Sequence, residues 1–334
     1  MKVNLYYEFP NDNALINGSI KANWVHNFVK VANKLIEKYP EIEFEKVFRW
    51  SGNMASKNPW SRELGVPFDK NTHASISDTI FIIENIENKK YFVITMWDKG
   101  YWEISAWSDL DEKCVEVFAH AGMHVDDYTY KLSPIKYTPL NIPTIMHEEE
   151  NVINEFYYNN LKENKRITPD KLFFQTSTLY LFRKYIFENE PNRYNLNLGY
   201  DRDLYTWFSK LSQSKVNMDI NCVAEPSGRI SQIMGLGTAL LRPKLNHKFQ
   251  NDLIPNYHYI LVEHEDFDFE KHHDINLYYQ SLSNAYIDTY ERVKNETDFI
   301  EFISKNGREY WENHCVPDKW VSDTVNLIDL NKLK

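Results

Sequence analysis

The first half of the chain alternates apolar and polar residues in short runs, and this period of two predicts β-strands. The first run spans residues 1–9, and after a polar loop the apolar residues recur at helical spacing from Trp24 to Ile36. A strand, a polar loop and a helix in this order are typical of a Rossmann-like domain. Further strands are expected at residues 44–50, 79–84, 90–95, 114–119 and 137–143. The short turn between the runs 79–84 and 90–95 is typical of antiparallel neighbours.

The second half repeats this order after the polar stretch 148–170. We therefore predict an α/β protein with two Rossmann-like domains, residues 1–165 and residues 166–334, which face each other across a cleft. Ligands of such domains bind at the carboxyl ends of the strands. The elements expected first in the second domain are a strand at 172–174, a polar loop at 175–178, a helix over 179–187, a loop over 193–203 and a helix over 204–211. Near the end of the chain, helices are expected over 275–293 and 298–315.

The stretch 215–245 carries the clearest local signal in the sequence. Apolar residues alternate over 216–222 as in a strand, and Ser227, in the Glu-Pro-Ser-Gly turn that follows, is a good helix N-cap. Apolar residues then share one face of a helix over 229–235. A glycine break separates this helix from a short buried strand at 238–241.

Arg229 is the unusual residue of this stretch. It lies in the first turn of the predicted helix, where the helix dipole disfavours a cation by about 0.3–1 kcal/mol. The same turn offers unpaired N–H groups, which bind anions. A phosphate would bond these amides and the guanidinium together and so remove the conflict. The alternative is that Arg229 pairs with Glu225 on the surface.

These residues resemble the donor-binding segment of GT-B glycosyltransferases. The segment is most similar to that of the protein O-glucosyltransferase and capsule-associated glycosyltransferase group, with exostosin-like enzymes next. The resemblance extends from about residue 171 to the C-terminus and includes an aromatic-rich strand at 257–262 and a Gly-x-x-x-aromatic spacing at 307–311. The residues that match in the donor segment are Ser227, Arg229, Gly237, Thr238 and Ala239.

The resemblance implies the GT-B fold and a transferase that moves a hexose or pentose from a nucleotide-sugar to a hydroxyl of a glycan or protein, with a UDP-sugar as the expected donor. It also implies inversion, no metal ion and no further cofactor. Many GT-B enzymes carry a Glu on the donor helix that binds ribose, whereas the equivalent residue here is Gln232. The residues expected to bind the donor are Gln175, Thr176, Ser177, Arg183, Glu225, Ser227, Gly228, Arg229 and Thr238.

Such a transferase usually needs a base that removes the proton from the acceptor hydroxyl. Asp98 is the first candidate, because it follows the predicted strand 90–95 and lies among aromatic residues that could stack on a sugar and raise the pKa of its carboxyl group. Asp12, in the first loop, is the second candidate, and His120 and His124 are the third. For each of them an ordinary role in a solvated loop is the alternative.

Other chemistries stay open at this point. Asp266-Phe267-Asp268 follows a predicted strand, as does the metal-binding Asp-x-Asp of the GT-A class, although such a triplet arises readily by chance among 48 acidic residues. His272-His273-Asp274 is interpreted as surface. The chain could also be a glycosyltransferase that acts on modified DNA, as some phages encode, or a carbohydrate-binding protein without catalytic activity.

The composition of the chain narrows the possible classes of function. A net charge of −10 disfavours nucleic acid as a partner. The three cysteines are far apart in the sequence, which argues against a disulfide framework and a cysteine zinc site. The N-terminus lacks the apolar region of a signal peptide, and no apolar run approaches the roughly 20 residues of a membrane helix. We therefore expect a cytoplasmic protein without a transmembrane segment.

Overall fold

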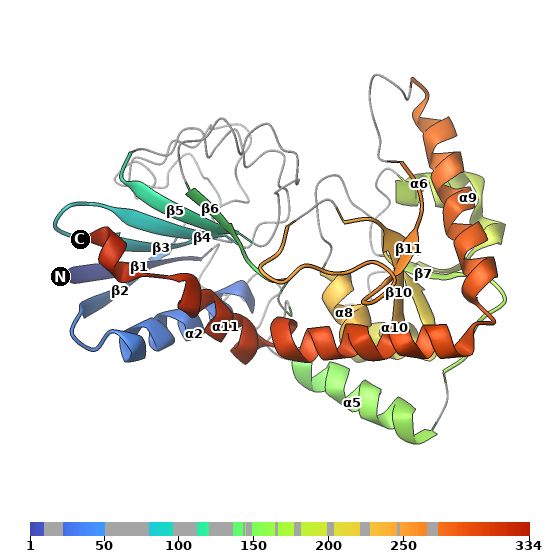
Figure 1. Cartoon of the computed structure of the whole chain (residues 1–334), viewed down its shortest axis with the longest axis horizontal. Helices are drawn as coiled ribbons and strands as arrows, with labels where there is room; N and C mark the ends of the chain where they lie inside the picture. The colour runs from blue at the N-terminus through green and yellow to red at the C-terminus, as the bar shows by residue number, and fades with distance from the viewer. Residues whose placement is uncertain are drawn as a thin grey trace. The chain divides into compact units, whose positions relative to one another are not determined.

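The chain is an α/β protein that divides into two compact units (Figure 1). Unit 1 comprises Met1–His147, Asn246–Asn251 and Val316–Lys334, and unit 2 comprises Glu148–Leu245 and Asp252–Cys315. The predicted α/β class with two Rossmann-like units is confirmed, while a cleft between the units stays a prediction. The computed structural model describes residues 1–9, 23–50, 80–95, 112–119, 136–142, 144, 149–163, 166–176, 182–198, 204–220, 228–245, 248–265 and 273–334.

Unit 1 is built on a six-stranded sheet of order β2-β1-β3-β4-β5-β6. β1 and β2 are parallel and are connected through α2 (Asn23–Lys38), and β4, β5 and β6 are parallel to one another. β3 is antiparallel to both of its neighbours, and the short turn after it predicts the pairing with β4. The strands are β1 (Lys2–Phe9), β2 (Glu43–Trp50), β3 (Ile80–Asn85), β4 (Tyr91–Thr95), β5 (Cys114–Ala119) and β6 (Lys136–Pro139).

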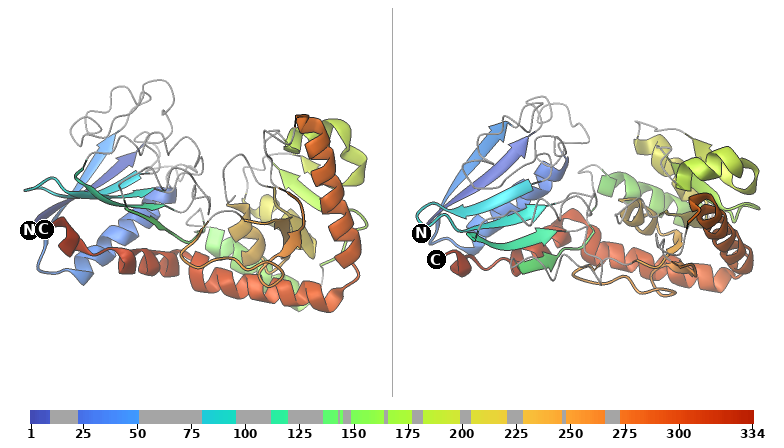
Figure 2. Two further views of the ribbon diagram at one scale, coloured as in Figure 1. Left: turned by 45° about the horizontal axis from the view of Figure 1, so that its top comes forward. Right: turned by 90° about the horizontal axis from the view of Figure 1, so that it is seen from above.

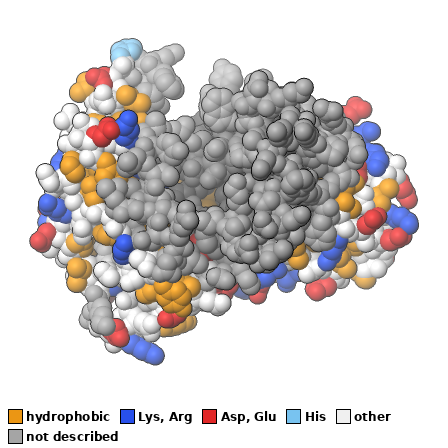
Figure 3. All heavy atoms as spheres, turned by 180° about the vertical axis from the view of Figure 1, so that it is seen from behind, with side chains coloured by type: hydrophobic (Ala, Val, Ile, Leu, Met, Phe, Trp, Pro, Cys, Tyr) orange, Lys and Arg blue, Asp and Glu red, His pale blue; other side chains and the backbone are white. Residues whose placement is uncertain are grey.

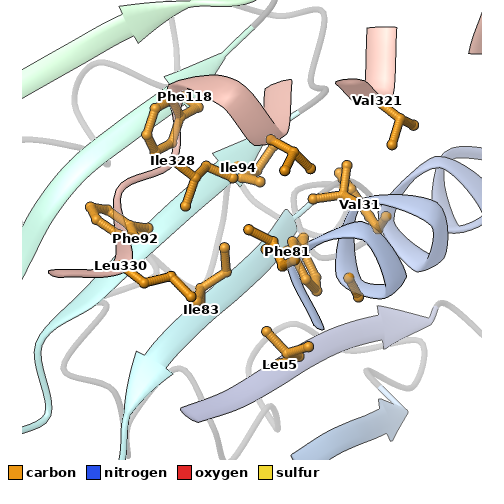
Figure 4. Close-up of a cluster of buried hydrophobic side chains, with 14 of the residues drawn as sticks. Leu5, Val31, Phe81, Ile83, Phe92, Ile94, Phe118, Val321, Ile328 and Leu330 are labelled. Carbon is orange, nitrogen blue, oxygen red and sulfur yellow. The ribbon is translucent and has the colours of Figure 1, made fainter. Parts of the chain in front are cut away.

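One apolar cluster forms the core of unit 1 (Figure 4). Leu5 and Phe81 project from the sheet, Val31 comes from α2, and Val321 comes from α11 (Pro317–Leu327) near the end of the chain. Leu330 follows in a 3-10 turn and is fully buried in the same cluster. Burying a side chain of this size stabilises the fold by about 1.5–3 kcal/mol. Unit 1 therefore needs residues 316–334 to complete its core.

Unit 2 is built on a five-stranded sheet of order β11-β10-β9-β7-β8, in which all neighbouring strands are parallel. Counted from β7, the first strand of this unit, the order is 2-1-3-4-5, which is a doubly wound arrangement. Ligands of such sheets bind where the carboxyl ends of the first and third strands lie side by side, and these strands are β7 and β9 here. The strands are β7 (Phe173–Thr176), β8 (Asn195–Leu198), β9 (Val216–Met218), β10 (Ala239–Pro243) and β11 (Ile260–Val262).

Helices cover both faces of this sheet. α6 and α9 lie side by side (Figures 1 and 2) and pack on one face in a cluster that contains Val216 and Met218. Asn217 points to the other face, where it donates a hydrogen bond to the Leu211 carbonyl oxygen of α7. α5 and α8 contact each other, α5 also contacts α7, and α8 also contacts α10. The helices are α5 (Glu149–Glu163), α6 (Phe182–Asn189), α7 (Leu204–Gln213), α8 (Arg229–Gly235), α9 (Ile275–Val293) and α10 (Thr297–Tyr310).

The two units differ from the predicted division of the chain at residue 165. α5 belongs to unit 2, because its buried Val152 and Ile153 face α7 and α8. Residues 316–334 belong to unit 1, because Trp320 and Val321 lie in its core and the Trp320 indole donates to the Asn141 carbonyl oxygen at 2.9 Å. Packing of apolar side chains, which the order of elements does not reveal, decides both assignments.

Three elements differ from their predicted forms. The expected loop over 193–203 contains β8, in which Asn and Leu alternate over four residues. The expected helix over 298–315 is α10 followed by a π-helical turn, Trp311–Cys315. The expected strand over 216–222 is shorter, because β9 ends at Met218. The strands β8 and β9 have only four and three residues, so periodicity alone does not define them.

Candidate functional site

The switch point of the unit 2 sheet is the place where the first and third strands, β7 and β9, lie side by side. Two arginines that the sequence predicts to bind the donor lie there, each at the start of a helix. Arg183 is the second residue of α6, which follows β7, and Arg229 is the first residue of α8, which follows β9. Both side chains are buried, at 6% and 7% exposure. Gln175 and Thr176 are the last residues of β7 and so lie at the carboxyl end of the sheet. This is the edge at which ligands of doubly wound sheets bind.

Arg229 lies against two aromatic rings and one carboxylate. Its Cζ atom is 5.7 Å from the centroid of the Phe174 ring and 5.9 Å from that of Trp207. Its Nη1 atom is 4.0 Å from Oδ1 of Asp219. Phe174 is on β7, Trp207 is on α7, and Asp219 directly follows β9. Three elements that meet at the switch point therefore hold one guanidinium group.

Asp219 also forms a buried ion pair with Arg242 of β10. Nη1 of Arg242 donates to Oδ2 of Asp219 at 2.9 Å, and both side chains have no solvent exposure. The Tyr286 hydroxyl of α9 donates to the Asp219 carbonyl oxygen at 2.6 Å. Burial raises the pKa of Tyr286 well above its usual value, so that this hydroxyl keeps its proton. Asp219 is thus fixed from both faces of the sheet, and it stands beside two guanidinium groups.

The helix that begins at Arg229 has only seven residues, and its N-cap is Gly228 rather than the predicted Ser227. The Gly228 cap makes no side-chain hydrogen bond. The N-cap therefore lies one residue later than predicted, and Ser227 itself lies outside the described residues. A helix this short has a weak dipole, so an anion at this position would have to be bound by the arginine side chain.

The other end of α8 is held by two arginines. Arg166 donates to the carbonyl oxygens of Leu236 and Gly237, and Arg308 donates to that of Gly235. Burial, together with the nearby charge of Arg308, lowers the pKa of Arg166 to about 10, which leaves the guanidinium charged at neutral pH. Cations are favourable at the C-terminus of a helix, so this pair stabilises α8.

Gln232, at the position where many GT-B enzymes bind ribose, is occupied by contacts within the protein. Its carbonyl oxygen accepts a hydrogen bond from the Trp207 indole at 3.1 Å. Its amide nitrogen donates to Oε1 of Glu149 at 2.9 Å, and Glu149 is fully buried. Both ends of the Gln232 side chain are thus used within unit 2.

Thr238, another predicted donor-binding residue, lies apart from Arg229. It precedes β10 and therefore lies at the amino end of the sheet, beyond the far end of α8. Its hydroxyl donates to the Ile233 carbonyl oxygen and accepts from Asn217, and the residue is 1% exposed. These bonds connect α8 to β9, so the structure gives Thr238 a place in the scaffold.

Of the remaining residues that the sequence singles out, the structure describes two, and the others lie outside the described ranges. His273 and Asp274 are exposed, as expected, and Asp274 caps α9 by accepting a hydrogen bond from the Asn276 amide at 2.8 Å. Among the residues that the structure describes, no three metal-ligating side chains converge. The predicted residues that lie outside the described ones are Asp12, Asp98, His120, His124, Ser177, Glu225, Ser227, Asp266, Asp268 and His272.

A separate hollow of about 500 Å³ opens at the carboxyl end of β11. His264 and Tyr278 line it, with ring centroids 5.0 Å apart, and Ser281 lies within 3.1 Å of the His264 ring. β11 is an edge strand and lies two strands away from β9. The hollow is therefore distinct from the cluster around Arg229.

Sequence reasoning missed Asp219, Arg242 and Trp207. Asp219 and Arg242 carried a usable signal, because each is a charged residue next to or within a short apolar strand, where a charge is costly unless it is paired. Trp207 carried none, since a tryptophan on an amphipathic helix is ordinary core. Its contact with Arg229 depends on tertiary packing.

No protein-family model and no curated protein matches the sequence. The chain is similar in structure to a glycosyltransferase from Rickettsia africae ESF-5, with 11% identity, 98% of each chain covered and a TM-score of 0.47. It is similar to HepE of Anabaena in complex with UDP and glucose, with 8% identity, 96% of this chain and 98% of that chain covered and a TM-score of 0.49. It is also similar to the pneumococcal O-GlcNAc transferase GtfA in complex with UDP and GlcNAc, with 12% identity, 65% of this chain and 46% of that chain covered and a TM-score of 0.38. At these TM-scores the likeness carries no argument, and the function must be argued from the site.

None of the helices that the structure describes has the length and the apolar composition needed to cross a lipid bilayer.

The buried ion pair of Asp219 and Arg242 predicts that a small substitution lowers the stability of the protein strongly. Asp219→Asn keeps the shape of the side chain but leaves the Arg242 guanidinium buried without its carboxylate, which should lower the free energy of unfolding by about 3–5 kcal/mol. Urea denaturation followed by circular dichroism measures this change. The control is Glu43→Gln, which breaks an exposed pair with Lys2 of similar length, 2.8 Å, and should leave the midpoint unchanged. Equal, small effects of the two substitutions would contradict the prediction.

Proposed function

We propose that this chain is a glycosyltransferase of the GT-B type that transfers a hexose or pentose from a nucleotide-sugar, with a UDP-sugar as donor, to a hydroxyl group of a glycan or protein. The observation that carries the proposal is Arg229, a buried guanidinium at the switch point of a doubly wound parallel sheet. A guanidinium binds phosphate oxygens in a bidentate manner and with a permanent charge. The resemblance of residues 215–245 to donor-binding segments supports the same assignment.

The proposed chemistry needs two contributions from the protein. The acceptor oxygen attacks the anomeric carbon, while the bond from that carbon to the diphosphate oxygen breaks and the diphosphate leaves with the electron pair. Arg229 stabilises the negative charge that develops on the leaving group, with Arg183 and the loop after β7 as further donor contacts. A base takes the acceptor proton, so that attack from the opposite side inverts the anomeric carbon. Asp98 is the proposed base, with Asp12 as the alternative, and no metal ion takes part.

Two other functions have weaker support. A GT-A-type enzyme would use Asp266 and Asp268 on a divalent ion, and it would give Arg229 no role. A transferase acting on modified DNA would need a basic surface, whereas the net charge is −10. On the face shown in Figure 3, the acidic and basic side chains of the described residues are interspersed rather than gathered by sign.

The first test concerns the donor site. Arg229→Ala should weaken the binding of UDP by about 1.5–3 kcal/mol, because a charge-assisted contact to the diphosphate is lost. Arg229→Lys should recover only part of the affinity, since an ammonium lacks the planar fork. Isothermal titration calorimetry measures both. Arg292→Ala, an exposed arginine in the last turn of α9, is the control and should bind UDP as the unmodified protein does. Unchanged affinity of Arg229→Ala would place the donor elsewhere.

The second test concerns the metal. Transfer should continue in excess EDTA and should not rise with added manganese, because the proposed site neutralises the leaving group with guanidinium groups. The assay follows UDP release from a panel of UDP-sugars. Activity that EDTA abolishes and manganese restores would argue for Asp266 and Asp268 instead.

The third test concerns the base. Asp98→Asn should lower turnover by roughly 10²–10⁴ while UDP binding stays nearly intact, since an amide cannot accept the acceptor proton. Steady-state kinetics and calorimetry on one preparation separate the two effects. Asp288→Asn, an exposed carboxylate on α9, is the matched control. Normal turnover of Asp98→Asn would remove Asp98 from the mechanism and leave Asp12 to be tested.

A further inference from the structure

Arg229 stands at the end of a chain of side-chain contacts that begins at a buried carboxylate. Oε1 of Glu149 accepts a hydrogen bond from Nε2 of Gln232 at 2.9 Å, and Oε1 of Gln232 accepts one from the Trp207 indole at 3.1 Å. The Trp207 ring in turn lies 5.9 Å from the Arg229 guanidinium carbon. The chain connects α5, α8 and α7 and ends at the switch point of the sheet.

The polarity of this chain is fixed by chemistry. An indole N–H can only donate, so the carbonyl oxygen of Gln232 must face Trp207. The amide nitrogen of Gln232 must then face Glu149, where a carboxylate accepts its proton. Glu149 is fully buried and Trp207 is 9% exposed, so water does not readily replace either partner. The orientation of the indole ring follows from these two bonds.

We infer that Trp207 is a positioning residue for Arg229, and that Gln232 and Glu149 fix the ring on which the guanidinium rests. A guanidinium over the face of an indole is attracted by the ring quadrupole and keeps its planar fork available for an anion. Phe174 lies 5.7 Å from the same guanidinium carbon and supports it from β7. The inference rests on the proposed function in one respect, since it takes the anion to be the diphosphate of a nucleotide.

The same geometry explains why a glutamine occupies position 232. A glutamate there could still accept from Trp207, but its second oxygen would face the Glu149 carboxylate at hydrogen-bond distance. Two buried carboxylates in contact repel each other, and one must take up a proton or move. Gln232 is therefore matched to Glu149, and exchanging the two residues should restore the pattern of donors and acceptors.

The first experiment uses the indole as a reporter. The protein is labelled with 5-fluorotryptophan, and the ¹⁹F resonance of Trp207 among the nine tryptophans is assigned from Trp207→Phe. Addition of UDP, and separately of inorganic pyrophosphate, should shift this resonance and leave that of Trp320 unchanged. Trp207→Phe should also weaken UDP binding about tenfold, because the smaller ring attracts a cation less and lacks the anchoring N–H. Trp320→Phe is the matched control, since it loses one indole hydrogen bond of 2.9 Å in unit 1 and should bind UDP normally.

The second experiment exchanges the acid and the amide without touching the rings. Gln232→Glu should weaken UDP binding about tenfold, and Glu149→Gln combined with Gln232→Glu should restore it to within about threefold, which a double-mutant cycle quantifies. A role of these residues in stability alone would change the melting temperature without this pattern in affinity. The exchange also tests the inference if Trp207→Phe proves unstable.

The outcomes separate the inference from the proposed function. The inference is overturned, and the proposed function still holds, if UDP binding depends on Arg229 but is unchanged by Trp207→Phe and by the substitutions at Gln232 and Glu149. In that case the Trp207 resonance should also not shift when UDP is added. A Trp207 shift with pyrophosphate but no binding of UDP supports the inference and argues against the nucleotide. No response to either anion overturns both.

Discussion

Seven residues are too few for a helix to be stable in water by itself, and the candidate site depends on such a helix. α8 keeps its place because the carbonyl oxygens of its last residue and of the two residues that follow accept hydrogen bonds from Arg308 and Arg166. Its glycines allow close packing: a Cβ on Gly235 would lie 2.8 Å from the Trp311 ring, and one on Gly237 would lie 2.6 Å from Tyr157. Gly237 also has φ near +64°, which favours glycine. The backbone position of Arg229 therefore depends in part on contacts at the opposite end of its own helix.

The parts of this arrangement that sequence could predict are those with a local cause. Helix α9 spans the predicted residues 275–293, because its apolar periodicity is long and Asp274 supplies a cap at its start. Arg229 could be singled out because a cation in a first turn conflicts with the dipole of its own helix. The two arginines at the C-terminal end of α8 could not be predicted from the sequence. Arg166 and Arg308 lie 142 residues apart in the sequence and meet only through the packing of α5, α8 and α10.

The other contacts of the site could not be predicted from the sequence either, because they too depend on tertiary packing. Asp219 and Arg242 pair across two neighbouring parallel strands, and the register Leu241 to Met218 that aligns them depends on the whole sheet. β8 is four residues long, and its Asn-Leu alternation is too brief to distinguish a strand from a loop. The division between the units depends on which core accepts Trp320, and a helix with one apolar face can pack on either of two cores.

The composition of unit 1 has a consequence for how the chain is made. Its sheet is synthesised first, yet its core includes Val321, Ile328 and Leu330, which leave the ribosome after the whole of unit 2. At about 5–20 residues per second, synthesis of residues 140–330, which follow the last strand of this sheet, takes on the order of 10–40 s. During that time the apolar face of the first sheet lacks the side chains that cover it, while unit 2, with no residue beyond Cys315, can complete its own core sooner. Unit 2 should therefore complete its core before unit 1 does, although most of unit 1 is synthesised first.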